Sequence, residues 1–167
     1  MIRRLQIASI AVLLLPQLAV AHWPADPSDN LVIADHPGAQ SLSRLVAAPD
    51  GGFYAAWIDA TSGSDVRLQR LDADGAEQWP HNGIVVADRA LDSVVDYGLD
   101  VDANGDALLA FQIEIDGRMQ VVASRFSPSG EPLWGTPGIV VSDDPDIAHS
   151  AHVAAIGDGD AMLGWNG

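Results

Sequence analysis

Cysteine is absent from the 167 residues, so no disulfide bond can staple the fold. Lysine is absent as well: all eight basic residues are arginine, against 23 acidic residues, which gives a net charge of −15 with histidine neutral. An acidic chain of this kind repels nucleic acid and anionic lipid, so we expect neither as a partner, whereas cations should be attracted. Stability must come from core burial, bound ions or partner chains.

The sequence has no apolar run long enough to span a bilayer, which needs roughly 18–20 residues. Its longest candidate, Ile7–Leu15, follows the basic pair Arg3-Arg4 and precedes the small residues of Ala19–Ala21. Basic, apolar and small-residue segments in this order predict a secretory signal peptide over residues 1–21, with a retained anchor as the alternative. We therefore expect a periplasmic or extracellular protein that has no transmembrane anchor after cleavage.

Helical periodicity is missing after residue 21, and proline and glycine interrupt every candidate segment. A serine nucleophile motif, a phosphate-binding glycine loop and zinc-ligand spacing are missing too. We therefore predict an all-β protein and assign no catalytic residue and no cofactor-binding residue. A pair of catalytic carboxylates stays open, because 23 acidic residues offer many pairs.

What the sequence does contain is a repeat of about 54 residues. Asp50–Trp57, Asn104–Phe111 and Asp158–Trp165 each combine a polar residue and a glycine, an apolar middle and a final aromatic residue. A polar-glycine pair between apolar runs favours a tight hairpin turn, because glycine accepts a positive φ.

A second block follows the first in each unit. Arg70–Trp79 is followed by Gly83–Val86, and Arg125–Trp134 is followed by Gly138–Val141, with a spacing of 55 residues. Asn30–Asp35 aligns with the segment that begins at Gly83. We expect strands in the apolar segments of every unit. In the first unit they are residues 43–48, 65–72 and 84–86, and in the second unit they are residues 98–103, 118–127 and 139–141. The third unit has residues 152–156. Each unit has one further strand, which ends at Trp57, Phe111 or Trp165.

Four short strands per unit predict an antiparallel, incomplete β-propeller of two to three four-stranded blades. The segments Gly75–Trp79 and Gly130–Trp134 resemble the tryptophan-docking repeats of quinoprotein-like propellers in secreted bacterial proteins. The resemblance implies that each tryptophan is buried against a neighbouring blade. It carries over no quinone cofactor and no catalytic residue, because the turn lacks the threonine that usually precedes the glycine.

The repeated glycines and aromatic residues are expected to have mechanical roles in turns and in packing between blades. They are Gly51, Trp57, Gly75, Trp79, Gly83, Gly105, Phe111, Gly130, Trp134, Gly138, Gly159 and Trp165. Trp23 is the tryptophan that we place outside the repeated register.

The predicted organisation is a signal peptide over 1–21, a lead over 22–29, and units at about 30–82, 83–137 and 138–167. Closed propellers have about four or more blades, and the last unit is incomplete, so we expect a truncated fragment. Its unpaired C-terminal strand could support self-association. A small self-contained β-domain and a ring completed by several chains are the alternatives.

Two weak metal candidates remain. Asp100, Asp102, Asn104 and Asp106 resemble the first half of a calcium loop, although Phe111 stands where the twelfth residue should be acidic, so we favour a simple hairpin turn. Cleavage after residue 21 would make His22 the amino terminus, where its amine and imidazole could bind copper.

His149 and His152 form the one close histidine pair, which we interpret as surface histidines. The function we expect is an exported, non-catalytic binding or scaffolding module whose partner is a protein or a glycan. A fragment of a secreted hydrolase or lyase is the alternative.

Overall fold

The computed structural model describes Trp23, Asp26 and residues 28–89, 96–142, 149–157 and 159–166. The predicted signal peptide and the copper candidate His22 lie outside the described residues.

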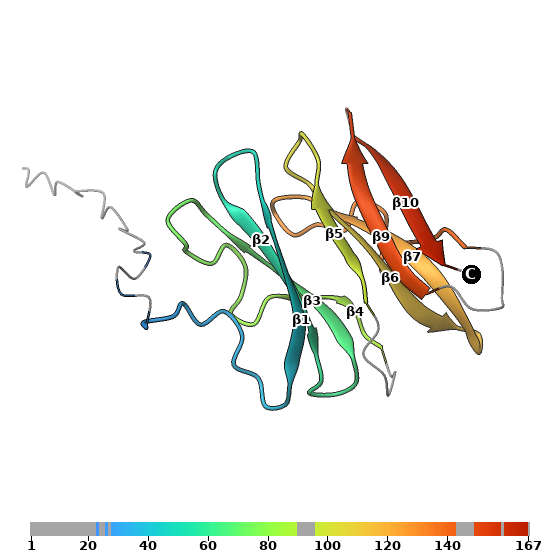
Figure 1. Cartoon of the computed structure of the whole chain (residues 1–167), viewed down its shortest axis with the longest axis horizontal. Coiled ribbons are helices and arrows are strands. Elements are labelled where there is room, and N and C mark those ends of the chain that lie inside the picture. Colours follow the sequence, from blue (N-terminus) through green and yellow to red (C-terminus); the bar gives the residue numbers. More distant parts are fainter. Residues whose placement is uncertain are drawn as a thin grey trace, which may run out of the picture.

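The described residues form ten β-strands and no helix, which confirms the all-β, antiparallel prediction (Figure 1). No helix in these ranges is long and apolar enough to cross a membrane. The strands are β1 (Gln40–Ala47), β2 (Phe53–Asp59), β3 (Asp65–Leu71), β4 (Ile84–Ala87), β5 (Gly98–Val101), β6 (Ala107–Ile115), β7 (Arg118–Phe126), β8 (Ile139–Val140), β9 (His149–Ile156) and β10 (Asp160–Asn166).

The strands form three separate sheets, in which neighbours along the chain are also neighbours in space. Sheet 1 has the order β1-β2-β3-β4, sheet 2 has the order β5-β6-β7-β8, and sheet 3 is the hairpin β9-β10. Every described pairing is antiparallel, and none of the three sheets closes on itself.

Most expected strands are found within one or two residues of their predicted ends. Strands β2 and β6 continue past Trp57 and Phe111, and Asn30–Asp35 carries no strand. The sheets span residues 40–87 and 98–140, so their limits are shifted from the predicted units. A repeat in the sequence predicts the distance between units, but it does not specify the residue at which each unit begins.

Glycines close the first turn of each sheet. Gly51, Gly105 and Gly159 have φ values of +88°, +84° and +98°, in the left-handed region that L-residues rarely adopt. In sheet 1 the turn is held by a hydrogen bond from the Ala48 nitrogen to the Gly52 oxygen at 2.8 Å. Asp50-Gly51 and Asn104-Gly105 therefore lie in hairpin turns, as the sequence predicts.

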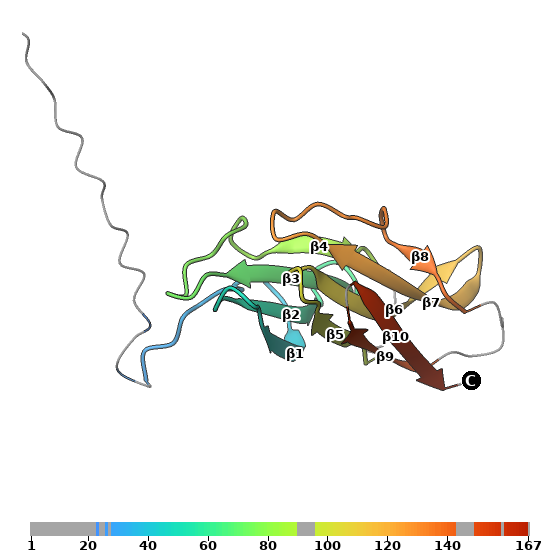
Figure 2. The ribbon, with the colours of Figure 1, turned by 90° about the horizontal axis from the view of Figure 1, so that it is seen from above.

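The sheets stack in chain order, with sheet 1 at one end and sheet 3 at the other (Figure 2). Tyr54, Ala56 and Ile58 of β2 share one buried cluster with Leu109 and Phe111 of β6. Complete burial of side chains as large as Ile58 and Phe111 stabilises the fold by about 2–3 kcal/mol each.

Strand β6 is buried on both sides, because its alternate side chains point to opposite faces. Leu109 and Phe111 face sheet 1, whereas Ala110 packs with Ala151 and Leu163 of sheet 3. This explains the unbroken apolar run at 107–111, which is typical of a strand that has no solvent-facing side.

Candidate functional site

The first strands of the three sheets, β1, β5 and β9, lie side by side (Figure 1). Gly98 allows the close approach of β5 and β9, since an added Cβ would lie 2.6 Å from the nitrogen of Val153. We call the surface where these three strands meet the seam. It is the first candidate site.

Two bulges shape the strands of the seam. Leu42 in β1 and Ser150 in β9 have φ values of +50° and +52°. The strand register shifts beside each of them. A left-handed conformation costs a residue with a side chain about 1–2 kcal/mol, and such strain is found most often at functional positions.

An ion pair joins β1 to the start of β5. The Arg44 Nη2 atom lies 2.6 Å from the Asp96 Oδ1 atom, and the guanidinium carbon lies 5.4 Å from the centre of the Tyr97 ring. The Tyr97 hydroxyl donates a hydrogen bond to the Leu42 oxygen at 2.7 Å. The bulge, the ion pair and the buried tyrosine are therefore one connected arrangement.

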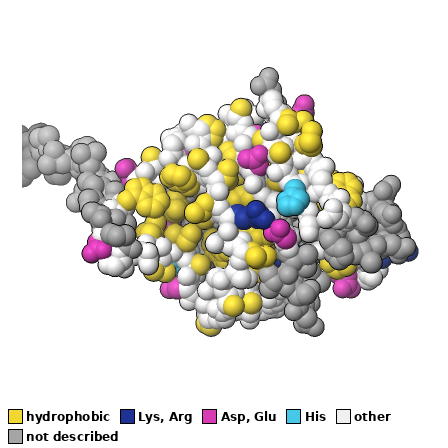
Figure 3. All heavy atoms as spheres, in the orientation of Figure 1, with side chains coloured by type: hydrophobic (Ala, Val, Ile, Leu, Met, Phe, Trp, Pro, Cys, Tyr) yellow, Lys and Arg dark blue, Asp and Glu magenta, His cyan; other side chains and the backbone are white. Residues whose placement is uncertain are grey.

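The electrostatics of the seam keep its carboxylate ionised. The hydrogen bond from Arg44 lowers the pKa of Asp96, and the charge of His152 acts in the same direction. Burial raises the pKa of Tyr97 above its ordinary value. Figure 3 shows a basic, an acidic and a histidine side chain close together on this face.

A hollow of about 240 Å³ lies beside this ion pair and is lined by Leu42, Ser43, Arg44 and Asp96. It offers a charged donor and a charged acceptor to a polar ligand. A carboxyl group whose pKa is lowered is a poor general acid at neutral pH, so the arrangement suits recognition better than proton transfer.

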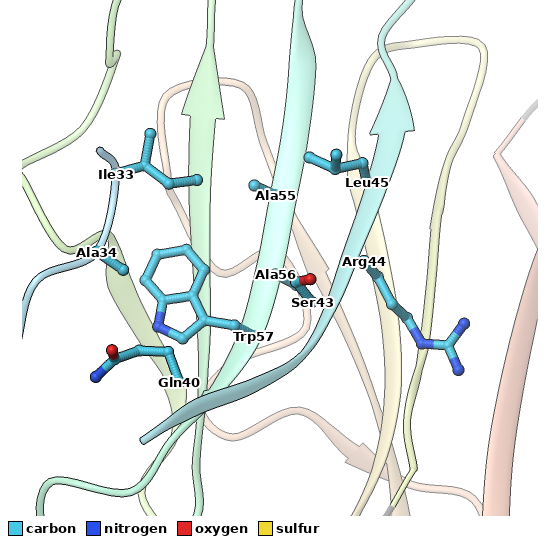
Figure 4. A pocket seen from close by; sticks show the side chains of 9 residues that line it. All are labelled: Ile33, Ala34, Gln40, Ser43, Arg44, Leu45, Ala55, Ala56 and Trp57. Carbon is cyan, nitrogen blue, oxygen red and sulfur yellow. The ribbon is translucent and has the colours of Figure 1, made fainter. Parts of the chain in front are cut away.

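A second hollow, of about 270 Å³, is mostly apolar and lies on the outer face of β1 and β2. Figure 4 shows the Trp57 ring between Ile33 and Ala34 of the N-terminal segment and the strands, while the Arg44 side chain points the other way. Trp57 is 3% exposed, and its indole nitrogen has no hydrogen-bond partner within the described residues. The hollow suits an apolar group.

The side chain of Arg89 connects sheet 1 to sheet 2. The sequence did not predict this contact. Arg89 is buried, its Nε atom donates to the Ser64 oxygen at 2.6 Å, and its Nη1 atom donates to the Gln112 oxygen of β6 at 2.9 Å. Burial lowers its pKa to about 10. In the sequence, Arg89 follows Ala87-Asp88 as His36 follows Ala34-Asp35. This match between two basic residues is a signal that could have identified Arg89 and His36 as candidates.

Trp79 links sheet 1 to the second turn of sheet 2. Its indole nitrogen donates a hydrogen bond to the Pro128 oxygen at 3.3 Å. An added Cβ at Gly130 would lie 3.2 Å from the ring, so a glycine is required beside the indole. Trp134, the residue in register with it, is only partly buried.

Trp23 has the same arrangement one sheet earlier, although we expected it outside the repeated register. Its indole nitrogen donates to the Ala73 oxygen at 3.0 Å, and an added Cβ at Gly75 would lie 3.1 Å from the ring. A proline follows both Trp23 and Trp79 in the sequence. This shared Trp-Pro pair is a signal from which the equivalence of the two tryptophans could have been predicted.

The other repeated positions lie in turns and in packed layers. Gly75 and Gly130 share a φ of +87°, and added Cβ atoms at Gly83 and Gly138 would lie 2.4 Å and 2.2 Å from backbone oxygens of the neighbouring strand. Phe111 is buried, whereas Trp165 is 39% exposed. These glycines leave no room for a side chain.

The predicted calcium ligands contact an arginine. The Asp102 Oδ2 atom lies 2.5 Å from Arg125 Nη2, and the Asp106 Oδ2 atom lies 2.9 Å from Arg125 Nε. The Asp102 Oδ1 atom accepts hydrogen bonds from the backbone nitrogens of Asn104 and Asp106. Asp100 accepts one from the backbone nitrogen of Ala155 at 2.8 Å. A calcium ion would have to displace Arg125.

Histidine ion pairs occur elsewhere than predicted. His81 contacts Asp35 at 3.2 Å through Nε2 and Glu77 at 3.0 Å through Nδ1. The pair from the sequence is spread along β9, where His152 is exposed. No group of three or more acidic or histidine side chains in the described ranges is placed to hold a metal ion.

Comparison with models of protein families, with curated proteins and with solved structures gave no match. The functional assignment therefore depends on the seam, on the apolar hollow and on the contacts between sheets.

Proposed function

We propose that this chain is an exported, non-catalytic binding or scaffolding module, built from repeated β-units that stack like propeller blades. The observation that carries the proposal is the matched docking of Trp23 and Trp79, each of which donates to the turn of the next sheet. A contact repeated in the same register indicates a modular scaffold.

The arrangement of the sheets supports the blade-like interpretation. The same strand of every sheet lies at the seam, and each sheet stacks on the next one along the chain. In repeat proteins of this kind, each unit contacts its neighbours and the surface that faces along the stack is free for partners.

The seam supplies the polar contact that a partner would use. Arg44 and Asp96 are both partly exposed and can offer donors and an acceptor to a protein loop or to the hydroxyl groups of a glycan. With a net charge of −15, the chain favours partners that are neutral or basic.

The hydrolase or lyase alternative has less support. Every described carboxyl group with a shifted pKa is shifted downward, and a general acid needs the opposite shift. These groups are Asp26, Asp35, Asp59 and Asp96.

Binding is tested with a panel of neutral oligosaccharides and of proteins from the same cell compartment. We expect the double change Arg44→Leu and Asp96→Leu to abolish binding that Arg118→Leu, which alters an exposed arginine in β7, leaves intact. Equal binding by both variants would refute a role of the seam. Export is tested by the mass of the recovered protein, which should begin at His22.

A further inference from the structure

Residues 31–36 lie beside the outer face of sheet 1 and carry no strand. We call this segment the strap. Its first two residues are exposed, whereas Ile33 and Ala34 are partly buried beside the Trp57 ring (Figure 4). A segment with so little buried apolar area is held chiefly by its polar contacts, and these lie at Asp35 and His36.

Asp35 attaches the strap to the loop between β3 and β4. Its backbone nitrogen donates to the Asn82 Oδ1 atom at 2.7 Å, and its Oδ1 atom accepts a hydrogen bond from Asn82 Nδ2 at 2.9 Å. The same Oδ1 atom lies 3.2 Å from His81 Nε2. An amide side chain keeps its donors and its acceptor at any neutral pH, so the contact with His81 is the part of this attachment that titrates.

His81 lies between two carboxyl groups, one for each ring nitrogen. Its Nδ1 atom lies 3.1 and 3.0 Å from the two carboxylate oxygens of Glu77, and its Nε2 atom contacts Asp35. Only the protonated imidazole carries a hydrogen on both nitrogens, because the neutral ring has one N–H group and one lone pair. Loss of the proton therefore turns a lone pair toward one of the two carboxylates, and that contact becomes repulsive.

The contact with Asp35 is the weaker of the two. Glu77 belongs to the same loop as His81 and offers both oxygens, and its side chain is 24% exposed, against 62% for Asp35. Water can therefore replace His81 at Asp35 more easily. The hydrogen bond from Asn82 lowers the pKa of Asp35, and the hydrogen bond with Glu77 raises the pKa of His81. The charge that changes near neutral pH is that of the histidine.

A second histidine ties the end of the strap to β2. The His36 Nδ1 atom lies 2.9 Å from the Oδ2 atom of Asp59, whose side chain is 1% exposed. Asp59 has two other partners, Arg67 Nε at 3.0 Å and the backbone nitrogen of Thr61 at 2.9 Å. Release of His36 therefore leaves no buried carboxylate without a partner, and a charged His36 holds Asp59 more strongly than a neutral one.

Two further features allow the strap to open. The indole nitrogen of Trp57 has no hydrogen-bond partner within the described residues, which destabilises the closed arrangement, since water would satisfy this donor. Beyond the strap, the backbone nitrogen of Ala60 donates to the Ala39 oxygen at 2.9 Å and keeps the chain attached to sheet 1. The strap can therefore move while its C-terminal end stays in place.

We infer that the strap is a pH-sensitive lid, which closes beside Trp57 when His36 and His81 are charged and opens as they lose their protons. The charged groups around the two histidines are Asp35, Glu77, Asp59 and Arg67. Opening gives water access to the Trp57 ring and to Ala55, which line the apolar hollow beside the strap. The inference goes beyond the proposed function, because it holds whether or not the seam binds a partner.

Because the chain has no cysteine, one introduced thiol can report the opening. Ala55→Cys places it in the hollow, at a position that is only 3% exposed. Its rate of reaction with methyl methanethiosulfonate, divided by the rate in the denatured chain at the same pH, measures the open fraction. We expect this ratio to rise about two- to fivefold from about pH 5 to about pH 9, the size that exposed ion pairs support.

The histidine variants are made in the same Ala55→Cys chain. The double change His36→Gln and His81→Gln should abolish the rise, and each single change should remove part of it. His152→Gln, which alters an exposed histidine in β9, should keep the full rise. A ratio that does not change with pH, or a rise that persists in the double variant, would overturn the inference.

Global unfolding is excluded with a thiol at a completely buried position of β6. Ala110→Cys should stay unreactive at both pH values, and equal reaction there and at Ala55→Cys would show that the whole fold opens and not the strap. If Ala55→Cys fails to fold, NMR measures the exchange of the Trp57 indole hydrogen with water in the unsubstituted chain. Its protection, relative to free indole at the same pH, should fall as the pH rises, and constant protection would refute the lid.

Discussion

The indole nitrogen of Trp79 donates a hydrogen bond to the backbone oxygen of Pro128, 49 residues further along the chain. The same ring lies against Tyr54, with 5.8 Å between the ring centres and a tilt of 53°. Trp79 therefore contacts the core of sheet 1 and the turn of sheet 2 at once. It is 8% exposed, so its loss would open a cavity between the two sheets.

Replacement of Trp79 by alanine should lower the free energy of unfolding by about 3–5 kcal/mol, the range for a buried aromatic side chain. Trp134→Ala is the matched control. We expect it to lower the free energy of unfolding by only about 1 kcal/mol, because the Trp134 ring is partly exposed. Denaturant unfolding followed by circular dichroism measures both. Equal losses for the two variants would show that Trp79 does not couple the sheets.

Replacement of Gly138 by alanine should be more damaging than the same change at Gly117. Both residues have positive φ, which costs alanine about 1–2 kcal/mol. At Gly138 the new Cβ would also lie 2.2 Å from the Ala123 oxygen, adding about 1–3 kcal/mol of overpacking, whereas Gly117 has nothing within 4 Å. Thermal melts compare the variants, and similar midpoints would refute the close approach of the strands.

Replacement of Arg125 by leucine should destabilise the chain by about 3–5 kcal/mol, because it leaves the buried carboxylate of Asp102 without its partner. Replacement of Asp102 by asparagine should cost less, since the amide oxygen can still accept the backbone hydrogen bonds. A larger loss for the asparagine variant would contradict this account of the turn.

Calcium provides a separate test of the same turn. Because Arg125 contacts both Asp102 and Asp106, we expect the melting midpoint to be unchanged when calcium or a chelator is added. A midpoint that falls in chelator and recovers with calcium would show that these carboxylates bind the ion in place of Arg125.

Stability should depend on pH through His81. Its pKa is raised above 6.5, first by the hydrogen bond with Glu77 and then by the charges of Glu77 and Asp35. The stabilisation is therefore complete below about pH 6.5 and is lost as the pH rises through the raised value.

We expect His81→Gln and Glu77→Gln to flatten the same part of the stability curve. NMR titration of His81 in the wild type and in Glu77→Gln measures the pKa directly. An unchanged pKa in the Glu77→Gln variant would contradict the assignment.

The strands could be predicted because their signals are local. A polar-glycine pair such as Asp50-Gly51 favours a turn through its own residues, and the unbroken apolar run of β6 marks a strand that is buried on both faces. The site could not be predicted in this way. Arg44 and Asp96 are 52 residues apart, and nothing in either segment specifies the other.

Arg89 shows the same limit. A charged residue after a short strand is normally a solvent-exposed residue, so its burial can be known only when the position of β6 is known. The calcium loop shows the converse error: Asp102 and Asp106 have a suitable local spacing, but the partner that they contact comes from β7.

The close contact between Gly98 and β9 determines which part of the protein would unfold first. The hairpin β9-β10 carries its own ladder of hydrogen bonds, so it can detach as a unit once its support is lost. Replacement of Gly98 by alanine would push the hairpin away from β5, because the added methyl group would lie only 2.6 Å from the Val153 nitrogen. Amide exchange would then quicken first at the C-terminal end, while sheets 1 and 2 kept their protection.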